Sequence, residues 1–373
     1  MGYVAVTGGQ AAIETANNLT QWYRLKDSDR SLKVEDIEHQ MRQLINRVMG
    51  EGGLYAPEYA AIAVKQAEGD PAEAAFLMRA YRSTLARNYY SETIEPEKMR
   101  VIRRISSSFK DIPGGQILGP TYDYTHRLLN FDLRDENHRD ALNQILDHLS
   151  IDPKHMSVKL TFQKVTDLLR EQGLVGNPDP QEQKPFDMTR QKLTFPASRS
   201  ARLQALSRGE TGAMTALAYS SLRGYGAVHP TIGELRVGYA GVAIAYPYDE
   251  KESLYIGEMM LTEVETINSF TLNDDGAITF RLGYGLVFGQ NETKAIAMAI
   301  LEQSLETKGK SPTQDEEFVL LHIDSVEANG FVSHLKLPHY ITFQSKLDVL
   351  RQSRKISMEQ KKNEMRDFKG QEV

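Results

Sequence analysis

The chain has 373 residues and a formal net charge of −6; 40% of the residues are hydrophobic and 25% are charged. This length is enough for two or three domains with a substantial core, and the composition is that of a globular protein and not of a disordered one. The negative charge argues against general nucleic-acid binding. Because the sequence has no cysteine, any metal must be held by His, Asp or Glu, or by a partner's ligands.

The start of the chain does not have the pattern of a targeting segment. Residues 1–9 lack a basic region followed by an apolar core, so we do not expect a signal peptide. No apolar run approaches the roughly 20 residues that a membrane-spanning helix needs. We therefore expect a cytoplasmic protein with no membrane partner.

The first 90 residues are predicted to be mainly helical. A short β-like run at residues 3–6 ends in two glycines. Apolar residues then recur at helical spacing, Asp70 is a suitable N-cap, and Pro57 and Pro71 stand where a first helical turn tolerates proline. We expect one packed unit with helices at residues 10–22, 34–48, 57–67 and 70–87.

The middle of the chain is predicted to hold a long shaped loop. Residues 111–127 are dense in glycine and proline, which is typical of such loops. Helices are expected at residues 138–150 and 156–172, and a polar, proline-bearing linker at residues 176–196.

The C-terminal half is predicted to mix helices and strands. Two helical pieces over residues 202–222 are separated at Gly209, and another helix is expected over residues 290–305. Runs rich in β-branched and aromatic residues predict strands at residues 234–246, 254–266, 280–288 and 317–323. The fold class is therefore α+β, a helical N-terminal region followed by a mixed region of helices and strands.

We divide the chain into four regions. Residues 1–130 form a mainly helical region with the glycine-rich loop at 111–127, and residues 131–196 form a helical pair and linker. Residues 197–346 form an α+β domain that carries a histidine pair. Residues 347–373 form a charged C-terminal tail, predicted to be a helix that frays at its end.

The histidine pair consists of His334 and His339, with Pro338 between them. In a helix their side chains would lie roughly 140° apart, and in a straight strand they would point to opposite faces. They converge only if the chain bends at the proline. Two histidines are too few for a closed zinc site, so a metal would need ligands from a partner, a substrate or water. The alternative is two unrelated turn histidines, one of them capping a backbone group.

An acidic cluster, Asp315, Glu316 and Glu317, stands at the start of the last predicted strand. Clustered carboxylates can bind magnesium or act as acid and base, because crowding separates their pKa values. The alternative is a solvated loop.

The loop at residues 111–127 offers groups that suit a phosphate. Gly114 and Gly115 allow backbone N–H groups to approach an anion closely, and Arg127 can make bidentate contacts. The spacing matches neither common phosphate-loop pattern. The alternative is an irregular loop in which Tyr122 and Tyr124 are buried.

Two further groups of charged residues have two interpretations each. Arg199 and Arg202 stand at an expected helix start, which suits an anion, although a serine there could simply cap the helix. Glu263 and Glu265 share one face of a predicted strand. An exposed edge is our default for that pair, and an inward-facing pair is the alternative.

Together these segments resemble one protein family over residues 3–346, least closely at residues 132–190. The motifs, as they stand here, are Tyr3-Val-Ala-Val with Gly8-Gly9, Asp111-Ile-Pro-Gly-Gly-Gln, Gly119-Pro-Thr-Tyr-Asp-Tyr-Thr-His-Arg-Leu-Leu129, Ser198-Arg-Ser, Arg223-Gly-Tyr-Gly, Gly283-Tyr-Gly-Leu-Val-Phe-Gly289, Gln314-Asp-Glu-Glu-Phe-Val319 and Gly330-Phe-Val-Ser-His-Leu-Lys-Leu-Pro-His-Tyr340. They are similar to those of PhnI, a subunit of the bacterial carbon–phosphorus lyase machinery.

The resemblance implies an enzyme subunit of phosphonate metabolism. A PhnI protein, together with PhnG, PhnH and PhnL, replaces the purine base at ribose C1′ of ATP or GTP by an alkylphosphonate, which makes it a transferase subunit. Alone it acts as a purine nucleosidase. It also joins PhnG, PhnH and the radical enzyme PhnJ in a core complex. The family's paired histidines, which match His334 and His339, are associated with a metal such as zinc where PhnI meets PhnJ.

On this basis we expect Mg²⁺ with the ATP and a triphosphate held by arginines and glycine amides. The expected substrate-binding residues are Gly114, Gly115, Tyr122, His126, Arg127, Arg199 and Arg202. Asp123, or one of Asp315, Glu316 and Glu317, is expected near the sugar, where a carboxylate stabilises an oxocarbenium-like state. The alternative function is a non-catalytic scaffold subunit of the core complex that provides half of a metal site.

Overall fold

The computed structural model describes residues 8–149, 162–176, 185–225, 229–272 and 276–370. The β-like run expected at residues 3–6 and the first part of the helix expected at 156–172 lie outside these ranges. Of the described residues, 9–326 form one compact unit, and 327–370 belong to another. The predicted α+β class is confirmed.

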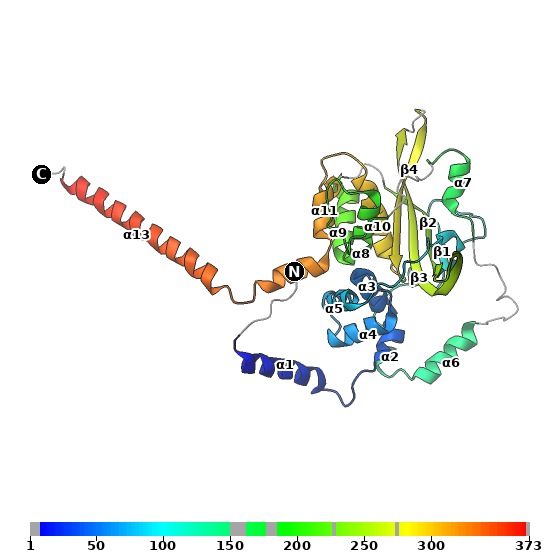
Figure 1. Ribbon diagram of the computed structural model, residues 1–373, viewed down its shortest axis with the longest axis horizontal. Helices are drawn as coiled ribbons and strands as arrows, with labels where there is room; N and C mark the ends of the chain where they lie inside the picture. Colours follow the sequence, from blue (N-terminus) through cyan, green and yellow to red (C-terminus); the bar gives the residue numbers. More distant parts are fainter. Residues whose placement is uncertain (1–7, 150–161, 177–184, 226–228, 273–275, 371–373) are drawn as a thin grey trace. The chain divides into compact units, whose positions relative to one another are not determined.

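The larger unit is built around a four-stranded antiparallel sheet within the described residues, in the order β1-β2-β3-β4 (Figure 1). The strands are β1 (Arg100–Ile105), β2 (Thr231–Tyr246), β3 (Asp249–Leu272) and β4 (Ile278–Phe288). The three predicted strands at 234–246, 254–266 and 280–288 are confirmed as β2, β3 and β4. The first strand is a structural finding that the sequence did not indicate, because three of its six residues are arginines.

Helices α8 (Arg199–Arg208), α9 (Thr211–Ser220), α10 (Glu292–Leu305) and α11 (Glu316–His322) gather beside β3 and β4 (Figure 1). The break between α8 and α9 follows Gly209, as predicted. The α10 helix packs directly on β4 because two glycines leave room for it. A Cβ on Gly283 would lie 2.1 Å from the Ala299 carbonyl oxygen, and one on Gly285 would lie 2.2 Å from that of Ala295.

The N-terminal helices α2 (Val34–Gln40), α3 (Arg42–Gly52), α4 (Pro57–Gln66) and α5 (Pro71–Thr84) share a core of their own. The expected packed unit is confirmed for these four helices but not for the helix predicted at 10–22, which buries no residue in the described part of the chain, and the single helix predicted at 34–48 is wrong because the chain breaks at Met41. The Asp70 side chain caps α5 by accepting from the Glu73 N–H at 2.9 Å. The α3 helix also contacts β4 and α8, so this helical group joins the sheet.

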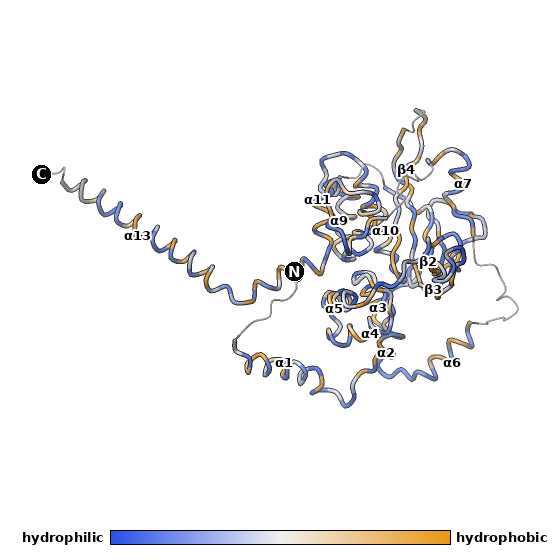
Figure 2. The backbone as a smooth tube through the Cα atoms, in the orientation of Figure 1, coloured by the Kyte–Doolittle hydropathy of each residue, from blue (hydrophilic) through white to orange (hydrophobic). Residues whose placement is uncertain are grey.

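Two amphipathic helices bury none of their side chains against the described part of the chain. These are α1 (Gln10–Leu25) and α6 (His138–Leu149), whose apolar and polar residues alternate along the backbone (Figure 2). The Trp22 side chain of α1 is 55% exposed. The shorter elements are α7 (Val165–Glu171), the 3₁₀ turns Pro96–Lys98, Phe131–Arg134 and Pro312–Gln314, and a π-helical turn, Ser221–Tyr225.

The strand predicted at residues 317–323 is wrong, because this segment forms α11. The Asp315 carboxylate accepts from the Phe318 N–H at 2.9 Å and caps the helix. Val319, Leu320 and Ile323 are buried, and their spacing suits one face of a helix. The apolar run was therefore too short to separate strand from helix by periodicity.

The smaller unit contains most of α12 (Ser325–His334) and all of α13 (Tyr340–Gly370). A helix beyond Lys346 was predicted, and α13 confirms it. Among the described residues, no helix is both long and apolar enough to span a membrane.

Candidate functional site

A cavity of about 750 Å³ lies where the first turn of α10 meets α3 and the loop after β1. Ligand sites commonly have volumes of this order. We call this cavity the α10 pocket. Its walls come from three distant parts of the sequence, residues 40–44 with 47, residues 120–123 with 127, and residues 290–294 with 211.

Arg103 of β1 is fully buried and holds the acidic rim of the α10 pocket. Its Nη2 lies 2.5 Å from Asp123 Oδ2, and its Nε lies 2.9 Å from Glu292 Oε2. Its Nη1 donates to the Leu118 carbonyl. Because the guanidinium is planar and offers a fixed fork of donors, one side chain fixes both the loop and the start of α10. Asp123 is thereby held in place at the rim.

Gln290 is buried and links the three walls of the α10 pocket. Its Nε2 donates to the Pro120 carbonyl at 3.3 Å and to Glu292 Oε1 at 2.8 Å. Its Oε1 accepts from Arg42 Nη1 at 2.5 Å. The arrangement is a preformed frame around the cavity.

Cationic side chains outnumber acidic ones in the α10 pocket. The cations are Arg42, Arg47, Arg127 and Lys294, and the acids are Asp123 and Glu292. An excess of positive charge around a concave site favours a polyanionic ligand such as a phosphate chain.

Three of the predicted site residues line the α10 pocket: Tyr122, Asp123 and Arg127. Arg127 Nη2 lies 3.6 Å from Asp123 Oδ1. Tyr122 is 75% exposed and Tyr124 is 63% exposed, so the alternative in which both are buried is wrong. His126 is exposed and is not part of the pocket wall.

Gly114 and Gly115 lie away from the α10 pocket wall, in a turn held by Arg104. The Gly115 N–H donates to the Ile112 carbonyl at 2.9 Å, so this amide is already used inside the turn. Arg104 Nη1 donates to the carbonyls of Pro113 and Gly115. Both glycines have positive φ, which explains their identity by backbone geometry alone.

Arg199 and Arg202 are paired with acids of other helices. Arg199 Nε lies 2.9 Å from Glu302 Oε1, and Arg202 Nη1 lies 3.4 Å from Glu316 Oε1. The Ser198 side chain caps α8, as in the simpler of our two interpretations.

The acidic cluster has structural contacts at the start of α11. Asp315 is its N-cap, Glu316 Oε2 accepts from the Ala197 N–H at 2.8 Å, and Glu317 is exposed. None of the three is part of the α10 pocket wall.

His334 and His339 belong to the smaller unit, and their rings do converge, with centroids 5.2 Å apart. His334 Nδ1 contacts the Phe331 carbonyl, and His339 Nδ1 lies 2.6 Å from the Leu337 carbonyl. This leaves both Nε2 atoms as possible ligands, because a backbone contact at Nδ1 is how metal-binding histidines are commonly oriented. No cluster of three or more His, Asp or Glu suited to a metal occurs in the described ranges.

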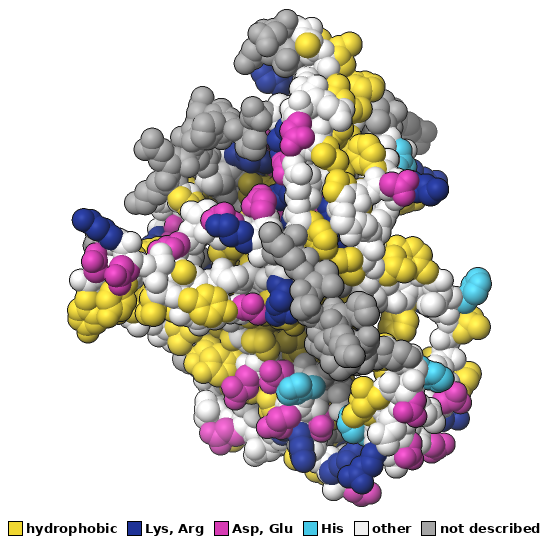
Figure 3. All heavy atoms as spheres, turned by 90° about the vertical axis from the view of Figure 1, so that its right-hand side faces the viewer, with side chains coloured by type: hydrophobic (Ala, Val, Ile, Leu, Met, Phe, Trp, Pro, Cys, Tyr) yellow, Lys and Arg dark blue, Asp and Glu magenta, His cyan; other side chains and the backbone are white. Residues whose placement is uncertain are grey.

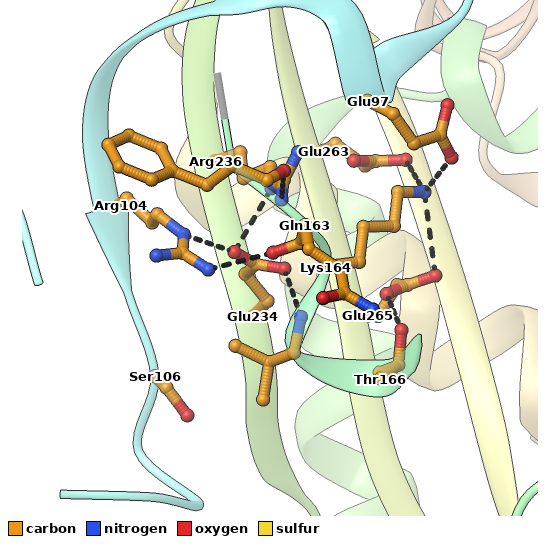
Figure 4. Close-up of polar contacts among 12 residues, drawn as sticks. Glu97, Arg104, Ser106, Gln163, Lys164, Thr166, Glu234, Arg236, Glu263 and Glu265 are labelled. Atoms are coloured by element: carbon orange, nitrogen blue, oxygen red, sulfur yellow. Dashed lines mark hydrogen bonds and ion pairs between the residues drawn. The ribbon is translucent and has the colours of Figure 1, made fainter. Parts of the chain in front are cut away.

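A network of buried charges lies on one face of β2 and β3, and Figure 4 shows Lys164 reaching into it. Lys164 Nζ lies 2.7 Å from Glu263 Oε1, 3.7 Å from Glu265 Oε1 and 3.1 Å from Glu97 Oε1. Glu263 and Glu265 are 2% and 5% exposed. Our default of an exposed edge is therefore wrong, and the inward-facing alternative is confirmed.

The same network includes a second pair on β2. Arg236 Nε lies 3.0 Å from Glu234 Oε1, and Arg104 Nε also contacts Glu234 (Figure 4). Across the two strands Arg236 stands opposite Glu263, a pair of opposite charge that stabilises the sheet. Glu234 stands opposite Glu265, a pair of like charge, and cations neutralise both: Arg104 and Arg236 contact Glu234, and Lys164 contacts Glu265.

Burial shapes the acid–base properties of this network. Burial raises the pKa of Glu263, and Glu265 adds to this while Lys164 opposes it. Burial also raises the pKa of Tyr284, whose hydroxyl donates to Glu263 Oε1 at 3.1 Å. Lys164, Glu265 and Tyr284 border a second cavity, of about 670 Å³. Its wall has four cations, as the α10 pocket has, but three acids, Glu97, Glu265 and Glu306, against two there, so its excess of positive charge is smaller.

The sequence interpretation missed Lys294, Arg42 and Arg47. A signal existed for Lys294, because a lysine in the first turn of a helix opposes the helix dipole and is unusual there. Arg42 and Arg47 looked like ordinary polar residues of an amphipathic helix. Charge is otherwise mixed on the surface, and the face in Figure 3 carries acidic and basic side chains close together.

Comparison with known proteins gives a consistent result. The family model described as bacterial phosphonate metabolism protein (PhnI) matches residues 2–357. The chain is 48% identical over 362 residues to HtxH of Stutzerimonas stutzeri, with 94% of this chain and 95% of that protein covered.

Two further relatives are named alpha-D-ribose 1-methylphosphonate 5-triphosphate synthase subunit PhnI. The one from Escherichia coli (strain K12) is 46% identical over 355 residues, with 94% of this chain and 97% of that protein covered. The one from Rhizobium meliloti (strain 1021) is 42% identical over 365 residues, with 95% of each chain covered. With the motifs and their order in the fold, these matches show that the chain belongs to the PhnI family of bacterial phosphonate metabolism proteins, subunits of the carbon–phosphorus lyase system.

Proposed function

We propose that this chain displaces the purine base of ATP or GTP at ribose C1′ and transfers the ribose 5-triphosphate to an alkylphosphonate, with the α10 pocket as the nucleotide site. The observation that carries the proposal is Asp123, fixed by Arg103 at the rim of a cavity lined by four cations. The names of two relatives, which are synthase subunits for a ribose 1-methylphosphonate 5-triphosphate, agree with this chemistry.

In the proposed reaction the bond between C1′ and the base nitrogen breaks, and its electron pair leaves with the base, which takes up a proton. An oxygen of the phosphonate forms the new bond to C1′; water takes its place when the chain acts alone as a nucleosidase. Positive charge develops on the sugar in such a transition state, and a fixed carboxylate stabilises it. Asp123 is suited to this role because Arg103 holds it before substrate arrives.

The triphosphate would lie against Arg42, Arg47, Arg127 and Lys294, the cations of the pocket wall. Mg²⁺ carried by the nucleotide would supply further neutralisation of the phosphates. Arginine forks suit phosphate oxygens because they donate two parallel hydrogen bonds.

The test is adenine release from MgATP by the purified chain, alone and with the partner subunits PhnG, PhnH and PhnL. Asp123→Asn should lower kcat by roughly 100-fold or more, since it removes a fixed charge needed in the transition state. Asp132→Asn, an exposed acid of the same connection, is the matched control and should keep full activity. Unchanged release by Asp123→Asn would remove Asp123 from the proposal.

The competing function is a scaffold subunit, which is favoured by the exposed apolar residues of α1 and α6. A scaffold would bind its partners tightly and release no adenine in any mixture. Release that depends on the nucleotide and on Asp123 would exclude this alternative.

We further propose that His334 and His339 form half of a zinc site completed by PhnJ in the cytoplasmic core complex. The converging rings and free Nε2 atoms fit two of the four ligands that structural zinc requires. Zinc should then bind the chain weakly alone and more tightly with PhnJ. Equal affinity in both states, measured by competition with a chelator, would contradict this.

A further inference from the structure

The inner wall of the α10 pocket contains a buried cation that has no partner. Lys294 is 0% exposed, and its Nζ has no hydrogen-bond partner in the described part of the chain. An ammonium group carries three N–H donors, and buried donors are almost always satisfied. A ligand that reaches this depth would supply what the protein does not.

The acids around Lys294 do not pair with it directly. Glu51 has the largest opposing charge effect on Lys294; its Oε1 accepts from Arg47 Nε at 2.9 Å and from the Thr211 N–H at 3.1 Å, while its Oε2, like Lys294 Nζ, has no hydrogen-bond partner among the described residues. Glu210, the other nearby acid, pairs with Arg47 and accepts from N–H groups at the start of α9. Neither acid forms an ion pair with Lys294 among the described residues.

Close approach to Lys294 is also prepared from α3. A Cβ on Gly50 would lie 3.3 Å from Lys294 Nζ, tighter than ordinary contact, so the absence of a side chain there leaves the ammonium its space. A larger residue at position 50 would displace the Lys294 side chain.

The start of α10 is itself uncapped. Asn291 occupies the N-cap position, but its side chain does not accept from the helix; its Nδ2 donates to the carbonyls of Asn46 and Phe288 instead. The first N–H groups of a helix have no partner within the helix, and the helix dipole favours an anion there. Residues 291–294 all border the α10 pocket. The Lys294 ammonium group and the N–H groups of the first turn of α10 therefore belong to the same part of the pocket wall.

We propose that Lys294 and the first turn of α10 bind the terminal phosphoryl group of a polyphosphate chain, so that this end of the pocket distinguishes nucleoside triphosphates from monophosphates. The inference deepens the proposed function and rests on it. Depth orders the cations: Arg42 and Arg127 are exposed, whereas Lys294 is fully buried. A phosphate chain held by the rim arginines would have to extend inward to meet the lysine.

The electrostatics of the site support this role. Burial lowers the pKa of Lys294 to about 8, although Glu51 raises it and Arg47 lowers it further. A bound anion would restore the charged form, because an opposite charge at close range favours the ammonium. Binding of a polyphosphate should therefore draw a proton onto the protein.

The experiment compares wild type with Lys294→Met and Lys294→Arg by calorimetric titration with ATP, AMP, adenosine and inorganic tripolyphosphate. Lys294→Met should weaken ATP and tripolyphosphate binding roughly 10- to 100-fold, the usual effect of a charged hydrogen bond. Its affinity for AMP and adenosine should change less than about twofold, and Lys294→Arg should recover part of the ATP affinity. Lys308→Met, an exposed lysine beyond the other end of α10, is the control.

Proton uptake gives an independent measurement. Titrations with tripolyphosphate near pH 8 in buffers of different ionisation enthalpy should show proton uptake by wild type and none by Lys294→Met.

Three outcomes are decisive. Wild type that neither binds ATP nor releases adenine would overturn the proposed function itself. Wild type that does both, with Lys294→Met weakening ATP and AMP equally or not at all, would overturn the inference and leave the proposed function standing. Selective loss of ATP and tripolyphosphate affinity would support both.

Discussion

Lys294 and Lys164 are both buried lysines, but their surroundings move their pKa values in opposite directions. Burial lowers the pKa of Lys294 to about 8, because the attraction of Glu51 offsets only part of the cost of removing the ammonium from water. Burial opposes the charge of Lys164 as well, yet Glu265 and Glu263 outweigh it and raise the pKa of Lys164. One lysine is thus satisfied by the protein, and the other is left for a ligand.

A pH dependence of stability follows for Lys294. Its folded-state pKa lies below the usual 10.5, so between about 8 and 10.5 the unfolded chain binds the proton more tightly, and stability from this group rises with pH. Below this window Lys294→Met should be the more stable protein by up to about 3 kcal/mol, and the difference should vanish above it. The groups that face Lys294 are Glu51, Glu210, Arg47 and Arg79. Urea unfolding of wild type and Lys294→Met below and above this pH window measures the difference in stability. A difference that stays the same at both pH values would contradict the prediction.

Glu263→Gln tests the buried network. The substitution leaves Lys164 with one fewer buried carboxylate, and breaking a buried ion pair costs on the order of 3 kcal/mol. Glu258→Gln on the same strand is the matched control, since its contact with Arg100 is exposed and worth less than about 1 kcal/mol. Equal urea midpoints for the two variants would show that Glu263 is not needed for stability.

At the scale of elements, the α10 helix packs closely on β4 because β4 has glycines at positions 283 and 285. Gly285→Ala would place a methyl group 2.2 Å from the Ala295 carbonyl, so the helix would have to move outward. We expect a loss of roughly 1–3 kcal/mol in the free energy of unfolding, as for other overpacked cores. Gly176→Ala, which has open space around it, should change stability by less than about 0.5 kcal/mol. Denaturant titration of both variants decides the matter.

Periodicity predicted the long elements and failed on the short ones. β2, β3 and β4 were expected because β-branched, aromatic and other apolar residues are enriched over segments of nine to thirteen residues, and α10 because its run is long and its start has polar residues. β1 was missed because two of its arginines, Arg103 and Arg104, are buried with acidic partners, which leave no mark in a hydropathy pattern. α11 was taken as a strand because seven residues are too few to show a period.

The candidate site was predictable only in part, because some of its residues are close together only in the folded chain. Tyr122, Asp123 and Arg127 lie within one unusual loop, and their chemistry is visible locally. Lys294 and Arg47 acquire meaning only when folding brings residues some 250 positions apart together, as the contact of Arg42 with Gln290, 248 positions away, shows. A single sequence contains no record of such neighbours.

At the scale of the whole molecule, the α10 pocket and the histidine pair belong to different compact units. A double substitution, His334→Ala with His339→Ala, should therefore leave ATP affinity within about twofold of wild type while abolishing zinc uptake in the presence of PhnJ. Calorimetry with ATP and metal analysis of the purified complex provide the two measurements. A matching loss of ATP affinity would mean that the two sites are coupled.

The exposed helix α1 has a practical consequence. Trp22 is the sole tryptophan of the sequence and is more than half exposed on a helix that buries none of its own residues in the described structure. Its emission therefore serves as an intrinsic optical label. A subunit that covers α1 should shift the emission to shorter wavelength, whereas a nucleotide in the α10 pocket should leave it unchanged. Assembly and substrate binding can thus be followed separately in one cuvette, without attaching a dye.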